Sequence, residues 1–590
     1  MKTILSILLS FTAALTLNAA SYGILVNGKT YFAGEATGEF EGFQQYLAHV
    51  QVKSGDYCQL HDLENDATWA VDLNTWSVEG FTRNGDRYEV SVDGCYDFYI
   101  KLKYEADELY IGNGTNCGSG EDISQIYRGS VPPRCTDVLM QAFFYNSYND
   151  DAPGAELVGN TSWATLLPQA AEIGKYIDLI WLPPSAMGEG TGYHPKQYSN
   201  QNSEWGTRAE LEALIAALHN AGAKVIADIV INHCANKSSW CDFYEMDFGE
   251  YGVFHPDASY ICRNDEVNLD PEAGDCYGKA TGNDDDGDNW AGARDWAHDN
   301  VYVQDFFKAY LLWMRNVMKY DGFRYDKGDG FNNWHHDNYN KTAKPYIAFM
   351  ECYSGDDQII WGIDHANKNL MALDFQTRWD AICGISDFNY KKCKGSGLLG
   401  RGYAKYAVTF IDSHDWFMRP DNENEFGGRG KSLTPDFKDR LLQANAYILG
   451  MPGVPCIFYP HWAKYKDDIK PMIRARKLAG VHSQSPVSDE SAEDGGYQCT
   501  LKGKYGWMIL QLGNKTVHDN KGANSWLADY DLIASGPGYA MWVNRTEPMP
   551  ADVGSQQPVA SSQTEKFIRN GQLFIRRGDK VFDIFGNAIK

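Results

Sequence analysis

The middle of the chain alternates short apolar runs with amphipathic helical patterns. Apolar runs over Val138–Phe144, Tyr176–Pro184 and Lys224–Ile231 have the length and composition of buried strands. Leu211–Ala221 and Val301–Met318 instead repeat apolar residues at helical spacing, which is typical of a helix with one buried side. Strands that alternate with helices indicate a parallel α/β sheet. We therefore predict an α/β domain here and expect the apolar stripe of Val301–Met318 to be core.

The regions on either side of this domain have the pattern of β-strands alone. Within residues 21–115, Tyr88–Val92 and Tyr96–Leu102 alternate apolar and polar residues, and Asp93-Gly94 between them predicts a hairpin turn. We interpret 21–115 as a small β-sandwich, followed by a Gly/Ser/Asn-rich linker at 116–135. Residues 483–545 again alternate as strands do, for example over Trp507–Leu512. A Pro/Ser/Gln-rich stretch and a basic tail, together 546–590, complete the chain.

Composition and charge narrow the range of functions. The 590 residues are too many for one core, and the 14% that are aromatic can stack on sugar rings or fill the core. The net charge of −25 argues against nucleic acid and anionic membranes as partners, whereas a neutral polysaccharide is indifferent to it. Residues 1–20 have the pattern of a signal peptide, with Lys2 before the apolar stretch Ile4–Leu17 and small residues at Asn18–Ala20. We expect an exported protein, secreted or held at the cell surface, with no membrane span.

Cysteines are numerous for a chain expected to be exported. Eight of them form two groups, one in the N-terminal third and one in the polar region after His233, and each group can form disulfides. The groups are Cys58, Cys95, Cys117 and Cys135, and Cys234, Cys241, Cys262 and Cys276. Cys352 and Cys456 lie in apolar runs and are expected to be buried thiols. None of these pairs has zinc-ligand spacing, and no nucleophilic Cys/His arrangement is evident.

Two acids stand at the ends of apolar runs in the α/β region. Asp321–Asp326 ends on an acid, and strand periodicity places Arg324 on the same face as Asp326. Glu351 closes the run Tyr346–Met350, and its distance from Asp326 suits one strand-helix-strand unit of a parallel barrel. Two carboxylates at neighbouring strand ends are what a retaining glycosidase needs.

Two further segments extend this pattern. Ile226–His233 lies upstream of the two acids and Phe410–Asp415 lies downstream. In this order, the four segments resemble those of the α-amylase family, glycoside hydrolase family 13. The likeness runs from about Asp137 to about Asn544 and is closest to plant-type and related Bacteroidetes α-amylases.

The resemblance implies a division into domains. It implies a (β/α)8 TIM barrel at 136–482, a small domain B inserted at 234–296, and an antiparallel C-terminal β domain at 483–545. Residues 21–115 resemble starch-binding carbohydrate-binding modules more loosely. The tail at 546–590 resembles sorting tails of exported Bacteroidetes proteins, and a plain terminal hairpin is the alternative. In the N-terminal module, five aromatic residues either form a sugar-stacking platform or fill the sandwich core, namely Trp69, Trp76, Tyr99, Tyr104 and Tyr110.

The resemblance also implies catalytic roles. Asp326 would be the nucleophile, kept ionised by Arg324 through charge-assisted hydrogen bonding. Glu351 would be the proton donor, which requires a raised pKa. Asp415 would be the third family carboxylate, which binds sugar hydroxyls.

Four more residues would shape the sugar-binding cleft. By resemblance, His233 and His414 would hydrogen-bond the sugar at the point of cleavage, and Tyr193 would stack under it. Asp228 would order the site from below, without touching substrate.

A calcium ion is the cofactor that the resemblance implies. Asn232, Asp295 and the backbone carbonyl of Gly330 correspond to ligands of the family's structural calcium, and oxygen ligands suit Ca²⁺. The acidic run Asn283–Asp288 either adds ligands or is a solvated loop, because it lacks the full spacing of a helix-loop-helix calcium site.

The chain departs from the family pattern at several positions close to the motifs. Asp329 stands where many members have lysine, and Ser413 where they have asparagine. Met350 replaces a usual glycine, and Ala297 replaces an aspartate of close relatives. These changes concern subsite preference and rate, since no catalytic carboxylate is lost.

These observations predict an exported α-amylase that hydrolyses α-1,4-glucan of starch internally, with retention, and acts as a monomer on starch and maltooligosaccharides. A transglycosidase or maltooligosaccharide-forming enzyme of the same family is one alternative. A catalytically weak starch-binding protein is another, which the joint presence of the three carboxylates and Arg324 disfavours.

Overall fold

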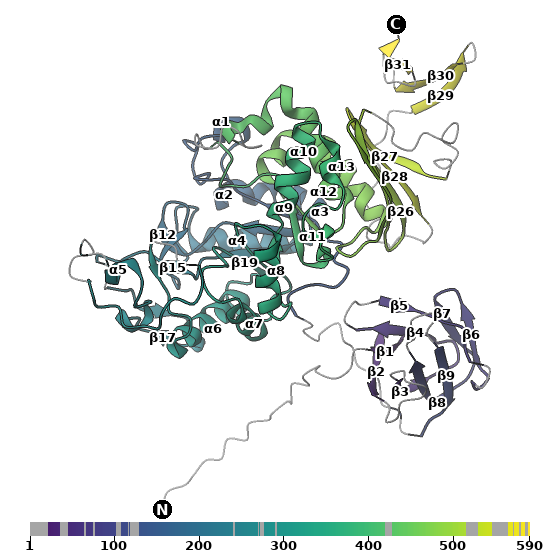
Figure 1. The fold of residues 1–590 in the computed structure, drawn as a ribbon, viewed down its shortest axis with the longest axis horizontal. Coiled ribbons are helices and arrows are strands. Elements are labelled where there is room, and N and C mark those ends of the chain that lie inside the picture. The colour runs from purple at the N-terminus through teal and green to yellow at the C-terminus, as the bar shows by residue number, and fades with distance from the viewer. Residues whose placement is uncertain are drawn as a thin grey trace, which may run out of the picture.

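The structure is a computed structural model, and Figure 1 shows its course. It describes residues 22–35, 45–63, 67–74, 77–101, 108–115, 117, 129–239, 242–269, 271, 277–288, 292–418, 428–514 and 529–545, and the backbone of the strands at 564–569, 572–577, 580–583 and 588–589. The signal peptide, most of the linker at 116–135, Trp76, Tyr104 and the Pro/Ser/Gln-rich stretch lie outside the described residues. Among the described residues, no helix has both the length and the apolar character to cross a membrane.

A closed barrel of eight parallel strands occupies the middle of the chain and confirms the predicted (β/α)8 fold. Each strand pairs with the next, and β10 also pairs with β23, which closes the barrel. Most of the strand residues are buried, as expected between a packed interior and a layer of helices. The strands are β10 (Leu139–Gln141), β11 (Leu179–Leu182), β14 (Lys224–Ile229), β19 (Gly322–Tyr325), β20 (Ala348–Met350), β21 (Met371–Leu373), β22 (Ala407–Phe410) and β23 (Val454–Phe458).

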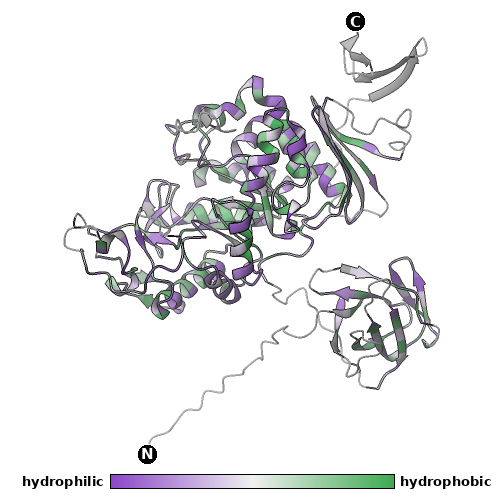
Figure 2. Cartoon of the chain, viewed as in Figure 1, coloured by the Kyte–Doolittle hydropathy of each residue, from purple (hydrophilic) through white to green (hydrophobic). Residues whose placement is uncertain are grey.

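Helices follow the barrel strands and carry both hydrophilic and hydrophobic residues along their length (Figure 2). A capping box of Thr207 and Glu210 starts α4, and the predicted apolar stripe of α6 is core, with Phe306, Tyr310 and Met314 buried. The longer helices are α3 (Ala170–Tyr176), α4 (Arg208–Asn220), α6 (Val301–Asn316), α7 (Trp334–Ala343), α8 (Asp356–His365), α12 (Lys438–Gly450) and α13 (Tyr459–Ala479). Shorter ones are α1 (Ala155–Val158), α2 (Trp163–Leu166), α5 (Glu266–Leu269), α9 (Phe375–Thr377), α10 (Cys383–Ser386) and α11 (Gly397–Gly400).

The alternation of strand and helix stops between β14 and α6, as predicted for the inserted region. Here β15 (His233–Cys234) pairs antiparallel with β18 (Arg294–Asp295), and β16 (Met246–Asp247) pairs with β17 (Val253–Phe254). The β15–β18 pairing brings the two ends of the insertion together. The next barrel strand can therefore follow directly after α6.

The N-terminal region is a nine-stranded sheet with the order β6-β7-β4-β1-β2-β3-β8-β9, to which β5 adds beside β4. Its parts enclose one core, in which Phe81 of β6 packs against Tyr96 and Phe98 of β8, in agreement with the predicted sandwich. The strands are β1 (Tyr22–Val26), β2 (Lys29–Glu35), β3 (Gln45–Val52), β4 (Tyr57–Asp62), β5 (Ala67–Trp69), β6 (Phe81–Asn84), β7 (Arg87–Val90), β8 (Gly94–Lys101) and β9 (Glu108–Asn113).

The predicted hairpin at Asp93-Gly94 is wrong. β7 pairs with β4 and β6, whereas β8 pairs with β3 and β9. Asp93-Gly94 therefore connects two strands that belong to different parts of the sheet. The partners of each strand are decided by the core that encloses Tyr88 and Phe98, and not by this dipeptide.

The C-terminal region is antiparallel, as expected from its alternating pattern. Its five strands have the order β24-β25-β26-β28-β27 and lie against α12 and α13. They are β24 (Val487–Glu493), β25 (Gly496–Lys502), β26 (Gly506–Gly513), β27 (Asp531–Gly536) and β28 (Tyr539–Arg545). A separate four-stranded sheet comprises β29 (Thr564–Arg569), β30 (Gln572–Arg577), β31 (Lys580–Asp583) and β32 (Ala588–Ile589).

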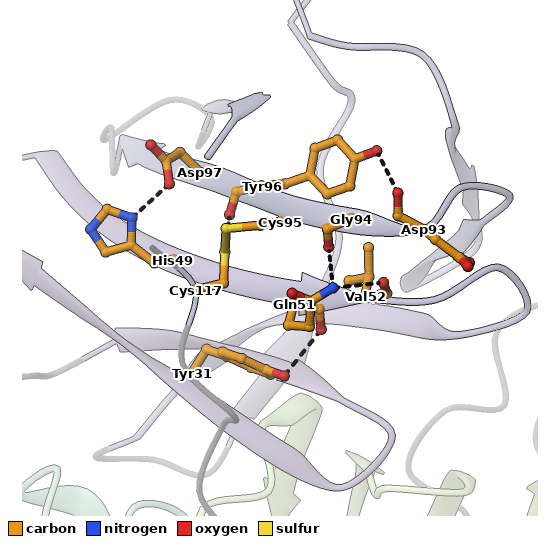
Figure 3. The surroundings of a disulfide bond; sticks show 10 residues. All are labelled: Tyr31, His49, Gln51, Val52, Asp93, Gly94, Cys95, Tyr96, Asp97 and Cys117. Carbon is orange, nitrogen blue, oxygen red and sulfur yellow. Dashed lines mark hydrogen bonds and ion pairs between the residues drawn. A yellow bond between two sulfur atoms is a disulfide. The ribbon is translucent and has the colours of Figure 1, made fainter. Parts of the chain in front are cut away.

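One disulfide of the N-terminal cysteine group is present, between Cys95 of β8 and Cys117 (Figure 3). The other two members, Cys58 and Cys135, are buried free thiols, because Cys58 points into the sandwich core and Cys135 packs into the core of the barrel region.

The second cysteine group differs from expectation where it is described. Cys234 and Cys262 are free and buried, and Cys241 and Cys276 lie outside the described residues. Cys352 and Cys456 are buried free thiols, as expected.

Candidate active site

The four sequence motifs meet at the carboxyl ends of the barrel strands. Asp326 directly follows β19 and Glu351 directly follows β20, while Asp228 lies inside β14, in register with Arg324. His414 and Asp415 lie on the loop after β22. Parallel pairing sets all of these ends on one rim of the barrel, which is where barrel enzymes hold their catalytic residues.

Arg324 is the centre of this arrangement. Its Nη1 donates to Oδ1 of Asp228 and to Oδ1 of Asp326, each at 2.8 Å, and its Nη2 lies 2.8 Å from Oε2 of Glu351. Burial opposes its charge, but the charges of these acids hold the pKa of Arg324 well above its ordinary value. The sequence predicted the contact with Asp326; the contact with Glu351 is new, and it joins the two candidate catalytic acids through one guanidinium.

Asp228 lies below the other acids and is buried. Its Oδ2 accepts hydrogen bonds from the indole N–H of Trp181 at 3.0 Å and from the hydroxyl of Tyr193 at 2.8 Å. Burial raises its pKa to about 6, against the lowering effect of Arg324. Because Trp181, Tyr193 and Arg324 all donate hydrogen bonds to it, Asp228 orients Arg324 and Tyr193.

Asp326 and Glu351 are held in different protonation states near neutral pH. Burial raises the pKa of Asp326 to about 6, while Arg324 opposes the rise. Burial raises the pKa of Glu351 to about 8, again against Arg324, and the charges of Asp415 and Asp326 add to the rise. At pH 7 Asp326 is therefore mainly a carboxylate and Glu351 mainly a carboxylic acid. This is the division that a nucleophile and a proton donor require.

His414 forms one wall of the site. Its ring stacks on that of Tyr193, with centroids 5.0 Å apart and an angle of 11° between the planes. The side-chain amide of Gln141 donates to Nδ1 of His414 at 2.7 Å. Nδ1 is therefore an acceptor, and the proton of the neutral ring lies on Nε2, which is 3.5 Å from Oδ1 of Asp415. Asp415 is the most exposed of the three candidate catalytic acids.

His233 lies on another side of the site, and its Nε2 contacts the backbone carbonyl of Tyr193 at 2.8 Å. A hydrogen bond to a carbonyl needs a proton on Nε2, and burial lowers the pKa of His233 to about 4. The ring is therefore neutral at pH 7.

These groups surround a cavity of about 410 Å³. Its lining contains both polar and aromatic side chains, which suits a ligand with hydroxyl groups on its edges and C–H groups on its faces. The lining residues are Tyr145, Asn146, Glu189, Gly190, Thr191, Tyr193, His194, His233, Asp326, Lys327, Glu351, His414 and Asp415.

Three residues that the sequence analysis did not name hold the site together. Gln141, at the end of β10, fixes His414, and Trp181, at the end of β11, fixes Asp228. The backbone N–H of Lys327 lies 3.3 Å from Oε2 of Glu351. Gln141 is the one polar residue within the predicted strand Val138–Phe144, and that was the available signal, whereas Trp181 lies in an apolar run that gave none. Lys327 acts through its backbone, so its residue type gave no signal in the sequence.

The predicted calcium ligands lie together behind this cavity. Oδ1 of Asn232 is buried without a hydrogen-bond partner, and a side chain at Gly330 would collide with it. The amide of Asn232 donates to Oδ1 of Asp295 at 3.0 Å, which orders both side chains. Oδ2 of Asp285 is also buried without a partner. Buried oxygen atoms that lack donors fit a hard divalent cation such as Ca²⁺.

The acidic run Asn283–Asp288 packs against the strand-end loop of β19, because Gly287 lies against Gly330. Asp284 pairs with Arg263 and Asp288 with Lys327. Asp284 and Asp288 are thus neutralised by basic residues, whereas Asp285 has a buried oxygen without a hydrogen-bond partner.

A second group of possible metal ligands is formed by Asp286, Asp299 and His335, whose ligand atoms lie within 4.8 Å of one another. Nε2 of His335 lies 3.2 Å from Asp286 and 3.4 Å from Asp299, distances that an ion pair also explains.

The positions that depart from the family pattern all have structural partners. Asp329 pairs with Lys327 at 3.0 Å, and the hydroxyl of Ser413 accepts from the backbone N–H of Asp415 at 3.2 Å. Met350 and Ala297 are buried. None of these contacts displaces Asp326, Glu351 or Asp415 from the cavity.

Known proteins similar to this chain were found by sequence and by structure. The family described as "Alpha amylase, catalytic domain" matches residues 171–344. Probable alpha-amylase 2 of Arabidopsis thaliana is 26% identical over 456 residues, which cover 72% of this chain and 97% of that protein. Alpha-amylase type B isozyme of Hordeum vulgare is 31% identical over 151 residues, covering 25% of this chain and 86% of that sequence. Glucan 1,4-alpha-maltotetraohydrolase of Stutzerimonas stutzeri is 26% identical over 437 residues, 68% of this chain and 70% of that protein. A solved Anoxybacillus α-amylase aligns with 15% identity and a TM-score of 0.49 over 70% of this chain and 99% of that one.

The chain belongs to the α-amylase family, glycoside hydrolase family 13, and is a glycoside hydrolase of the amylase type.

Proposed function

We propose that this enzyme is an exported α-amylase that hydrolyses internal α-1,4-glucosidic bonds of starch and related α-glucans with retention of configuration. The observation that carries the proposal is the contact of one buried arginine, Arg324, with both Asp326 and Glu351, whose pKa values lie on opposite sides of neutrality. The names of the plant and bacterial relatives, which include a maltotetraohydrolase, support α-glucan as the substrate.

In the first step, Glu351 gives its proton to the glycosidic oxygen while the ionised Asp326 attacks the anomeric carbon. The bond to the leaving group breaks, a covalent β-glycosyl ester forms on Asp326, and the leaving chain departs with the proton. Arg324 supports this step because it keeps Asp326 ionised for the attack and stabilises the charge that Glu351 acquires on losing its proton.

In the second step, Glu351 is a carboxylate and acts as a base. It removes a proton from water, the water oxygen attacks the anomeric carbon, and the ester to Asp326 breaks. The sugar leaves with the α configuration, and both acids return to their starting states. If a sugar hydroxyl replaces water, the same steps give transglycosylation.

The other cavity residues position the sugar. Tyr193 offers a ring face, and Nε2–H of His414 and the carboxylate of Asp415 offer a donor and an acceptor for hydroxyl groups. Asp415 also raises the pKa of Glu351, so it favours the protonated acid.

Calcium is proposed as a structural cofactor. Asn232, Asp295, Asp285 and the carbonyl of Gly330 would hold it, and it would supply positive charge that fixes the inserted region against the loop after β19. Every catalytic step described above uses residues of the chain alone.

Export, domain boundaries and oligomeric state are part of the proposal. The signal-peptide pattern at 1–20 and the Cys95–Cys117 disulfide support export to an oxidising compartment. We propose a binding module at 21–115, a catalytic barrel at 136–482 with its insertion at 234–296, a C-terminal domain at 483–545, and a monomeric enzyme.

The test is release of reducing ends from soluble starch by wild type and by Asp326→Asn, with product sizes and anomeric form followed over time. Wild type is expected to release α-anomeric maltooligosaccharides, and Asp326→Asn to lose the activity by a factor of about 10³ or more. Longer products than the substrate would identify transglycosylation. Binding of starch by wild type without any release would leave a glucan-binding protein and refute the enzyme.

A further inference from the structure

The outward face of strands β3, β8 and β9 in the N-terminal sheet carries a row of side chains that the core does not use. Along β8, Tyr96, Phe98 and Ile100 are buried in the core. Because side chains alternate along a strand, Tyr99 points to the other face, where it is partly exposed, and Lys101 shares this face but is buried.

Two tyrosines lie side by side on this face. Tyr99 of β8 and Tyr110 of β9 are register partners, and their ring centroids are 5.6 Å apart at an angle of 42°. The side chain of Tyr110 is 37% exposed. Leu47 of β3, the register partner of Tyr99 on the other side, continues the row. Neither tyrosine belongs to the core of the module, so core filling does not account for them.

A hollow of about 280 Å³ lies at these two rings. Its wall also includes the polar residues Asn74, Lys101 and Glu108 and the core residues Ile100 and Leu109. Lys101 and Glu108 are register partners of opposite charge, so the hollow has aromatic faces, polar groups at its rim and no net charge from this pair. That combination fits a neutral ligand with apolar C–H faces and hydroxyl edges, and does not favour an anion or a cation.

The strands under this row are firmly connected to each other. Beside the tyrosines, His49 of β3 contacts Asp97 of β8 at 2.6 Å, and the Cys95–Cys117 disulfide ties the segment after β9 back to β8 (Figure 3). Rings on a braced sheet are ordered before a ligand arrives, so little ordering entropy is lost on binding.

We propose that Tyr99 and Tyr110 form a non-catalytic platform on which the sugar rings of an α-1,4-glucan chain stack, with Asn74 and Glu108 at the rim facing its hydroxyls. The choice of an α-1,4-glucan as ligand rests on the proposed function, because the barrel of the same chain would cleave that polymer. The platform then keeps the enzyme on its substrate between cleavage events, which raises the local concentration of glucan at the barrel.

The test uses the full chain carrying Asp326→Asn, so that the glucan is not digested, and measures retention by amylopectin in affinity gel electrophoresis. Tyr99→Ala/Tyr110→Ala is expected to bind about tenfold more weakly, the size of loss that truncation of aromatic anchors produces. Tyr99→Phe/Tyr110→Phe keeps the ring faces and should retain most of the binding. Tyr57→Ala is the matched control, since Tyr57 is an exposed tyrosine elsewhere on the same module.

Unchanged retention in the double alanine variant overturns the platform, and so does an equal loss in Tyr57→Ala. The same tyrosine variants with Asp326 intact should cleave a short soluble maltooligosaccharide at the wild-type rate. If wild type fails to cleave that maltooligosaccharide while amylopectin retention depends on the tyrosines, the proposed function fails and the platform stands.

Discussion

The backbone N–H of Lys327 lies close to one carboxyl oxygen of Glu351, Oε2. The N–H lies 3.3 Å from Oε2, and Nη2 of Arg324 lies 2.8 Å from the same atom. Oε2 therefore lies beside a backbone N–H and a guanidinium, and both stabilise the negative charge that Glu351 acquires when it loses its proton.

We expect a bell-shaped dependence of kcat/KM on pH. Activity needs Asp326 ionised and Glu351 protonated, so it should rise with pH through the pKa of Asp326, about 6, and fall through that of Glu351, about 8. Each limb should change about tenfold per pH unit. Initial rates on a soluble maltooligosaccharide from pH 4 to 10 measure both limbs.

Glu351→Gln is the control for the alkaline limb. Its low residual rate should not fall above pH 8, because the group that titrates there is gone. An alkaline limb that persists in Glu351→Gln would assign this ionisation to another residue.

Replacing Arg324 by methionine should reduce both activity and stability. The variant leaves Asp228, Asp326 and Glu351 without their shared cation, and breaking a buried ion pair costs about 3–5 kcal/mol of unfolding free energy. Because Arg324 lowers the pKa of Asp326, the acid limb of the pH profile should also move upward. A loss of kcat of about 10² or more is expected.

Arg401→Met is the matched control, since Arg401 pairs with Asp357 at an exposed position. It should leave the denaturation midpoint and the pH profile unchanged. An acid limb that stays in place in Arg324→Met, in a protein that still folds, would contradict the role of Arg324.

Gln141 is expected to act through the tautomer of His414. Gln141→Leu removes the donor to Nδ1, and Gln141→Glu replaces it with an acceptor that draws the ring proton to Nδ1. Both changes weaken the Nε2–H donor that faces the substrate, and Gln141→Glu should be the worse of the two. We expect kcat/KM to fall about tenfold for leucine and further for glutamate, chiefly through KM. Equal kinetics for the two variants would exclude the tautomer as the cause.

Removal of calcium should lower the thermal midpoint of the enzyme. The buried oxygens of Asn232 and Asp285 lack donors, and a cation that they bind stabilises the folded state by an amount that grows with its free concentration. Chelation followed by a Ca²⁺ titration, read by differential scanning fluorimetry, measures the effect. Asp285→Asn should need more Ca²⁺ to recover its midpoint, and Asp284→Asn, an exposed acid paired with Arg263, should not. A midpoint that does not respond to chelation would refute the site.

Local pattern in the sequence was enough to predict a parallel α/β sheet with acids at its strand ends, and the resemblance of four motifs to the α-amylase family extended this to an eight-stranded barrel. Apolar strand runs ended where Asp326 and Glu351 begin, and parallel pairing then places these ends together. The hairpin at Asp93-Gly94 failed because turn chemistry is local, whereas the partner of each strand depends on the whole sheet. The contact of Arg324 with Glu351 and that of Gln141 with His414 join residues far apart in the chain, and no local pattern records them.

The pairing of β10 with β23 has a consequence for how the enzyme comes into being. The first barrel strand finds its second neighbour only after Val454–Phe458 has been made, and Gln141 cannot hold His414 until then. A nascent or interrupted chain that stops before Val454 therefore contains the candidate catalytic acids, but its His414 is not yet held by Gln141. Hydrolytic activity therefore requires the last barrel strand, and it is a sign that all eight strands have been synthesised and assembled.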